Sequence, residues 1–233
     1  MDARGLLEQM LQAGRSLASQ GRDMGEQKLG VPQDGPERDA MLSGMGKGAL
    51  AAGALGLLFG TKSGRKLGGS ALKVGSLAAL GGVAYKVYRD WQSQDAAGPV
   101  ALQDPGLPVD RLPAEQAERR SLLLLRAMVS AAQADGHVDD DERRRIQQGM
   151  EQLELDSDAR NFLQQELAKP ADPAALASQA DSPEAAAEVY LASLLAVNVD
   201  NYMERGYLDE LAKQLGLSPE LISRLEAEAQ AAA

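Results

Sequence analysis

The sequence predicts an all-α protein, a bundle of about six helices preceded by a glycine-rich helical segment. Three observations predict this class. No window of the chain alternates polar and apolar residues as a strand would. In the second half, serine followed by proline marks helix starts at Ser182–Pro183 and Ser218–Pro219, and Asp172–Pro173 marks a short turn. In the first half, small residues recur every four positions, a spacing typical of closely packed helices.

Composition excludes several functional classes. The 233 residues carry a net charge of −10, with no cysteine and one histidine. Disulfides, thiolate metal sites and multi-histidine metal centres are therefore excluded. The acidity argues against nucleic-acid binding. No nucleophile–base pair and no phosphate-binding loop is found, so the sequence predicts no enzymatic activity.

Charge divides the chain into four predicted regions. Residues 1–40 carry a net charge of −2 and predict an amphipathic helix followed by a polar linker. Residues 41–95 carry +5 and form a glycine-rich basic segment. Residues 96–114 form a proline-rich linker, and residues 115–233 an acidic helical domain. Such asymmetry indicates regions that face different environments.

The glycine-rich basic segment predicts association with a membrane. Its two apolar stretches, Gly48–Gly60 and Val74–Tyr85, would each span about 20 Å as a helix, less than the ~30 Å hydrocarbon core. Glycine is costly in a helix in water but tolerated in lipid. The small residues expected to pack helices, within one chain or in a homo-oligomer, are Gly48, Ala52, Gly56, Gly60, Gly64, Gly68 and Gly75. A flexible linker is the alternative, but it has no use for the large apolar side chains present.

An aromatic cluster ends this segment. Tyr85, Tyr88 and Trp91 lie beside Lys86 and Arg89. Aromatic side chains at the interface followed by bases are typical of an anchor on anionic lipid. The N-terminus shows no signal peptide, so we expect the helical domain to stay in the cytoplasm.

Start and stop signals predict the helices of the acidic domain. The expected helices cover residues 115–134, 139–153 and 158–168, one that begins at Ser182–Pro183, one over residues 206–215, and a last one that begins at Ser218–Pro219.

Two stretches of this domain carry a family resemblance. AAQADGHVDDDE, residues 131–142, resembles the Ala-Asp-Gly signature of the TerB-like tellurite-resistance fold, and residues 198–222 resemble the second half of such a domain. The glycine-rich segment before them is similar to YebE-like bacterial inner-membrane proteins of unknown function. The resemblance covers about residues 40–230 and implies an all-α domain on a membrane-associated stem, with no known reaction.

The resemblance also implies a site for a divalent cation. The matching acids are Asp135, Asp139 and Glu142, with Asp200 as the equivalent in the second half. Carboxylate oxygens are the ligands that Ca²⁺ and Mg²⁺ prefer. The alternative needs no metal, because Asp139 has the position of a helix cap and the neighbouring acids favour the positive end of that helix.

These observations together predict a membrane-associated, non-enzymatic adaptor or sensor module of the bacterial inner membrane. Its acidic domain is expected to bind a divalent cation and a partner protein. The first alternative is a soluble interaction protein whose glycine-rich segment packs on a partner helix. The second is a metal-dependent hydrolase.

Overall fold

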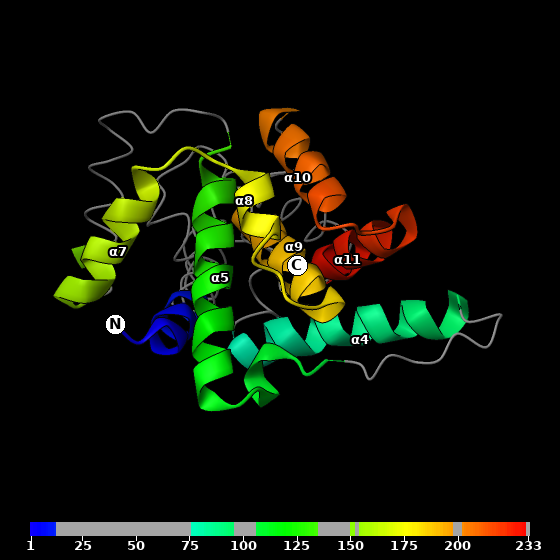
Figure 1. Cartoon of the computed structure of the whole chain (residues 1–233), viewed down its shortest axis with the longest axis horizontal. Helices are drawn as coiled ribbons and strands as arrows, with labels where there is room; N and C mark the ends of the chain where they lie inside the picture. Colours follow the sequence, from blue (N-terminus) through cyan, green and yellow to red (C-terminus); the bar gives the residue numbers. More distant parts are fainter. Residues whose placement is uncertain (13–75, 96–105, 135–149, 152–153, 198–201, 232–233) are drawn as a thin grey trace, which may run out of the picture.

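A computed structural model describes residues 1–12, 76–95, 106–134, 150–151, 154–197 and 202–231. Within these ranges the regular structure is helical and no strand occurs, which confirms the all-α class there (Figure 1). The elements are a helix over residues 3–12, α4 (Leu77–Asp95), η2 (Val109–Arg111), α5 (Ala114–Ala132), α7 (Ser157–Leu167), α8 (Pro173–Ala177), α9 (Pro183–Ala196), α10 (Tyr202–Gln214) and α11 (Pro219–Ala231). We call them together the helical body.

Helix α9 is the centre of the helical body. Every residue from Glu184 to Ala196 is buried. The helix packs against α4, α5, α10 and α11, so that it has neighbours on all sides. Its sequence explains this position, because a helix that is apolar on every face is stable only when it is surrounded.

Helices α5 and α9 run side by side in the same direction. Arg120 of α5 pairs with Glu188 of α9, and one to two turns later the Ser193 hydroxyl donates to the Ala127 carbonyl at 3.4 Å. In Figure 1, α5 stands upright between α7 on one side and α10 and α11 on the other. The C-terminal ends of α5 and α9 therefore lie at the same end of the helical body.

The predicted helix starts with proline are confirmed. The Ser182 hydroxyl accepts a hydrogen bond from the Ala185 amide at 3.1 Å, ahead of Pro183 at the first helical position. The segment after Asp172–Pro173, expected as a short turn, is the five-residue helix α8, which Asp172 caps in the same way by accepting from Ala175 at 2.9 Å. Side-chain oxygens at this position satisfy amides that have no partner inside the helix. The Ser218–Pro219 start of α11 has the same form.

Helix α10 begins at Tyr202, four residues before the start expected from Gly206. The earlier turn places Glu204 inside the protein, where it is 1% exposed. The helix ends at Gln214 and is followed by Gly216, whose φ is +67°. The Leu217 amide bonds back to Ala212 at 3.0 Å, which is a Schellman ending that glycine adopts without strain.

Two glutamates connect the N-terminal helix, residues 3–12, to α5 and α4 by hydrogen bonds. The Glu118 carboxylate of α5 accepts from the amides of Ala3 at 2.5 Å and Arg4 at 3.0 Å. Glu8 in turn accepts from the first amide of α4, that of Leu77, at 2.7 Å. Its apolar face, which includes the fully buried Leu7, lies in the common core.

The described part of the predicted linker also packs on the helical body. Val109 of η2 is fully buried. Pro108 and Pro113 hold extended backbone, with φ of −64° and −52°, just before η2 and α5. Because proline fixes φ and lacks an N–H donor, it fits the first turns of these helices rather than making the segment irregular.

Candidate functional site

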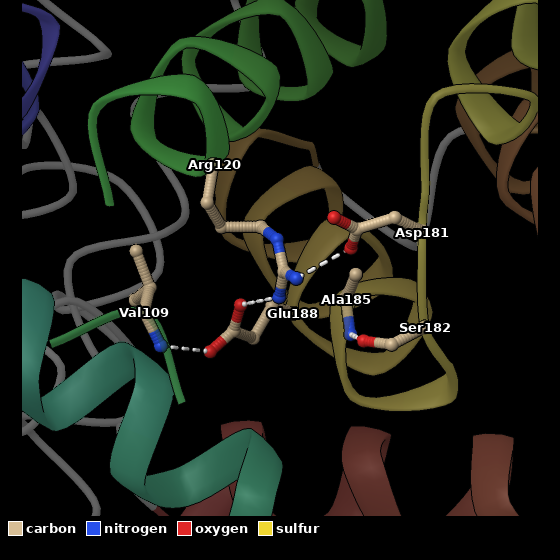
Figure 2. Close-up of polar contacts among 6 residues, drawn as sticks. All are labelled: Val109, Arg120, Asp181, Ser182, Ala185 and Glu188. Carbon is tan, nitrogen blue, oxygen red and sulfur yellow. Dashed lines mark hydrogen bonds and ion pairs between the residues drawn. The ribbon is translucent and has the colours of Figure 1, made fainter. Parts of the chain in front are cut away.

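The most buried charged cluster lies where α4, η2, α5 and α9 meet, and we call it the junction. Glu188 of α9 is 1% exposed and Arg120 of α5 is 7% exposed. Figure 2 shows how Arg120 joins two carboxylates: Nη1 donates to Glu188 Oε2 at 2.8 Å, and Nη2 donates to Asp181 Oδ1 at 2.6 Å. The Val109 amide donates to the other Glu188 oxygen at 2.8 Å.

Local sequence positions these groups. Ser182 caps α9 and fixes how the chain enters that helix, so Asp181 is held directly before it and faces Arg120 (Figure 2). Glu188 follows four residues after Glu184 and therefore lies on the same face of α9. Glu184 is also buried, 3% exposed, and its Oε2 lies 2.6 Å from where a Cβ on Gly106 would stand. A side chain at position 106 would displace this carboxylate.

The electrostatics of the junction centre on Glu188. Burial raises the pKa of its carboxyl above the usual glutamate range, while the Val109 amide and Arg120 lower it and Asp110 raises it further. The Asp110 Oδ1 atom is buried and accepts no hydrogen bond from the residues that the structure describes. Arg120 thus pairs with Glu188 and Asp181, while Asp110 adds a further carboxylate close to Glu188.

Gly81 of α4 lets that helix approach the two acids. A Cβ at this position would lie 3.0 Å from Val109 Cγ1, 3.2 Å from Glu188 Oε1 and 3.3 Å from Asp110 Oδ1. These contacts are tighter than ordinary side-chain packing. A side chain at position 81 would therefore require Val109 or the two carboxylates to shift by a few tenths of an ångström.

A second charged cluster lies on α9, α10 and α11. The hydroxyl of the fully buried Tyr190 donates to Glu226 at 2.8 Å. Arg205 pairs with Glu226 at 2.8 Å and with Asp209 at 2.9 Å. Burial, and then the Glu226 carboxylate, raise the pKa of Tyr190. The hydroxyl therefore stays protonated and acts as a hydrogen-bond donor.

The acids expected to hold a divalent cation lie outside the described residues: Asp135, Asp139, Glu142 and Asp200. Among the residues that the structure describes, no group of three acidic or histidine side chains is arranged to hold a metal ion. The small residues of the glycine-rich segment also lie outside the description: Gly48, Ala52, Gly56, Gly60, Gly64, Gly68 and Gly75.

The aromatic cluster expected at a membrane interface lies on α4. Tyr88 is 8% exposed and belongs to the core, and Trp91 packs partly buried against it, with the two ring centroids 5.8 Å apart. Tyr85 is half-buried, with the Arg89 guanidinium 5.7 Å from its ring centroid. Two of the three rings thus contact the helical body, and the expected contact of the cluster with lipid stays a prediction.

No helix within the described ranges has both the length and the apolar character needed to cross a membrane.

The sequence analysis did not identify the junction. A signal was present, because Glu184 and Glu188 interrupt a helix that is otherwise apolar on every face. A charge inside such a helix must be paired or hydrogen-bonded when the helix is buried. Its partner Arg120 lies 68 residues away in sequence, and no local pattern distinguishes it from the neighbouring Arg119.

Comparison with known proteins places the chain among proteins whose function is not known. It is 32% identical over 109 residues to an uncharacterised protein encoded in the ampR 5′ region of Yersinia enterocolitica, a match that covers 47% of this chain and 78% of that protein. No solved structure matches the chain. Residues 44–229 match the family described as "Protein of unknown function (DUF533)", and the chain belongs to this family.

Proposed function

We propose that the protein is a membrane-associated, non-enzymatic adaptor of the bacterial inner membrane, with its helical body in the cytoplasm. The glycine-rich segment before Ser76 is the stem that meets the membrane, where its small residues pack helices within or between chains. The resemblance of that segment to YebE-like proteins supports this proposal. The helical body is the part that meets a partner protein.

The observation that carries the proposal is the packing of α4. This helix is the end of the glycine-rich basic segment, and it packs against α9, α11 and η2. Its inward face carries Leu80 and Tyr88, while Lys86 and Arg89 are exposed on its outward face. A stem that ends inside the core transmits its position directly to the helical body. The two bases suit a surface of anionic lipid.

Flotation of the full chain with vesicles tests the membrane proposal. We expect the native chain to float with vesicles that contain phosphatidylglycerol and to float less with pure phosphatidylcholine. Reversing both α4 charges, Lys86→Glu with Arg89→Glu, reduces flotation, whereas Arg160→Glu on the exposed face of α7 does not. Recovery of the native chain in the soluble fraction of cells lysed without detergent contradicts the proposal.

The same proposal includes a sensor role for a divalent cation. Because α5 and α9 run parallel, the chain leaves both helices at one end of the helical body, at Ala134 and Val197. Asp135 directly follows Ala134, and Asp200 follows Val197 after two intervening residues. The C-terminal ends of two helices also present partial negative charge, which favours a cation. The TerB-like resemblance supports the same assignment.

Calorimetry of the full chain with Ca²⁺ and Mg²⁺ tests the cation site. The full chain is the right material because residues 3–12 and α4 contribute to the core. We expect binding that is lost in Asp135→Asn with Asp200→Asn and kept in Asp158→Asn, an exposed acid on α7. No heat at millimolar concentrations of either ion removes the sensor role while leaving the adaptor role in place.

A partner surface is favoured by one exposed aromatic. Tyr202 at the start of α10 is 89% exposed. Large aromatic side chains are enriched where proteins bind one another. Substitution Tyr202→Ser is expected to weaken capture of a partner without changing the thermal stability of the chain, and a large loss of stability would show a structural role instead.

A further inference from the structure

A groove follows one face of α5. It consists of two adjoining pockets of 310 Å³ and 340 Å³, which share the side chains of Arg126 and Gln179. Helix α5 forms one wall, and residues 166–181 form the other. The Arg126 Nη1 donates to Gln179 Oε1 across the groove at 3.0 Å and divides it. Both volumes lie at the small end of the range for ligand sites in proteins.

The larger pocket is rich in positive charge, although the chain as a whole is acidic. Its polar side chains are those of Arg119, Arg120, Arg126, Gln116, Gln179 and Asp181. Three arginines and two amides thus face one carboxylate, in a chain of net charge −10. Leucine side chains form the remaining wall. A small apolar pocket with several convergent donors suits an anionic ligand.

The three arginines are not equivalent. Arg120 is neutralised by the buried Glu188 and held by Asp181, so it belongs to the junction. Arg119 is exposed, and its partner Glu115 is also exposed, so this pair contributes little and can exchange. Arg119 and Arg126 lie seven residues, or two turns, apart on the same face of α5, about 10 Å along the helix. Their long side chains can therefore meet at one ligand.

Arg126 has a weakly satisfied donor. Its Nε atom is buried and makes no hydrogen bond to the residues that the structure describes. The nearest carboxylate, that of Glu166, lies 3.5 Å away and is engaged by Lys169 at 2.6 Å. A buried N–H group without a hydrogen bond is rare in proteins. The Arg126 side chain lines both pockets, and its ion pair with Glu166 is long and shared with Lys169, so an anionic ligand can compete with Glu166 for the guanidinium.

We propose that this pocket binds the phosphoryl group of a small molecule or of a lipid headgroup, with Arg126 and Arg119 as its cationic ligands. A phosphate monoester carries up to two negative charges and the phosphodiester of a lipid headgroup carries one, so two arginines attract either group. The phosphate oxygens accept from the Arg126 Nε and from side-chain amides at the same time. Glu166 competes with the ligand for Arg126. Removal of the Arg126 charge is therefore expected to weaken binding, and removal of the competing Glu166 charge is expected to strengthen it.

Calorimetric titration of the full chain with inorganic phosphate and with glycerol 3-phosphate tests the proposal. We expect saturable binding to the native chain. Arg126→Gln weakens it by about tenfold, the loss of one charge-assisted hydrogen bond. The matched control Arg160→Gln, on the exposed face of α7, leaves affinity unchanged.

A second variant separates ligand binding from mere structural damage. Glu166→Gln removes the competing charge, so it is expected to strengthen binding by about twofold to fivefold. A structural role of the groove would weaken binding or leave it unchanged in this variant. Helical circular dichroism of each variant confirms the fold.

Vesicles distinguish the two sources of phosphate. Vesicle flotation that Arg126→Gln reduces assigns the site to a lipid headgroup, and binding confined to the soluble esters assigns it to a small molecule. The proposal is overturned if the native chain binds no phosphate at tens of millimolar and no vesicle through Arg126. It is equally overturned if Arg126→Gln and Arg160→Gln weaken binding to the same extent.

Discussion

Two arginine–carboxylate clusters lie on either side of α9 and differ in burial. In the junction, Arg120 and Glu188 are 7% and 1% exposed. In the second cluster, Arg205 and Glu226 are 38% and 21% exposed. Water can replace a lost partner in the second cluster but not in the first. The hydrogen bonds are 2.8 Å long in both pairs, but the loss of stability on removing one partner is expected to be much larger for the buried pair.

The largest expected effect comes from removing the buried acid. Glu188→Ala leaves the buried Arg120 with only the exposed Asp181 as a carboxylate partner and is expected to destabilise the chain by about 3–5 kcal/mol. Arg205→Ala in the second cluster is expected to cost less than about 1 kcal/mol. Urea denaturation followed by circular dichroism measures both. Equal losses would show that burial does not separate the clusters.

The next effect tests how closely α4 covers the junction. Gly81→Ala forces a methyl group against Val109 and both acids, at a cost of about 1–3 kcal/mol that exceeds the gain in helix propensity. Its neighbour provides a matched control, because a Cβ on Gly82 meets nothing within 4 Å. Gly82→Ala is therefore expected to stabilise the chain by up to about 1 kcal/mol. Thermal unfolding of the two variants should shift in opposite directions.

A smaller effect is expected in the second cluster. Tyr190→Phe removes the hydroxyl that donates to Glu226, while Arg205 continues to hold that carboxylate. The expected loss of unfolding free energy is about 1 kcal/mol. A loss as large as that of Glu188→Ala would show that the second cluster is as dependent on its partners as the junction.

The smallest effect is a dependence on pH. Burial raises the pKa of Glu188 in the folded chain, so protonation favours the folded state. Relative to Glu188→Gln, which does not titrate, the native chain should gain stability as pH falls from 7 through that raised pKa towards the ordinary value of about 4.3. Denaturation of both chains across this range measures the difference. A difference that stays constant contradicts the assignment.

Local sequence signals predict where helices start, but they do not predict which helices pack against one another. Ser182–Pro183 and Ser218–Pro219 specify their caps within four residues, so their geometry follows from sequence alone. The pairing of Arg120 with Glu188 depends on the parallel arrangement of α5 and α9, which no local pattern contains.

The aromatic cluster of α4 shows a different limit. Tyr88 and Trp91 form an apolar helix face next to exposed bases. That pattern is the same whether the face is buried in lipid or against protein, because the hydrophobic effect has no direction. In the structure these two rings pack against protein, because α4 lies against α9 and α11, an arrangement that the sequence of α4 alone does not contain.

The hydrogen bond from the Leu77 amide to Glu8 has a topological consequence. It fastens the two described residues at a single point of the helical body, although 68 residues of chain lie between them. The intervening chain therefore begins and ends at the same place on the helical body. If it enters a bilayer, it must return to the side from which it came, so the number of crossings is even. Topology reporters inserted before and after this segment of the chain would then lie on the same side of the membrane.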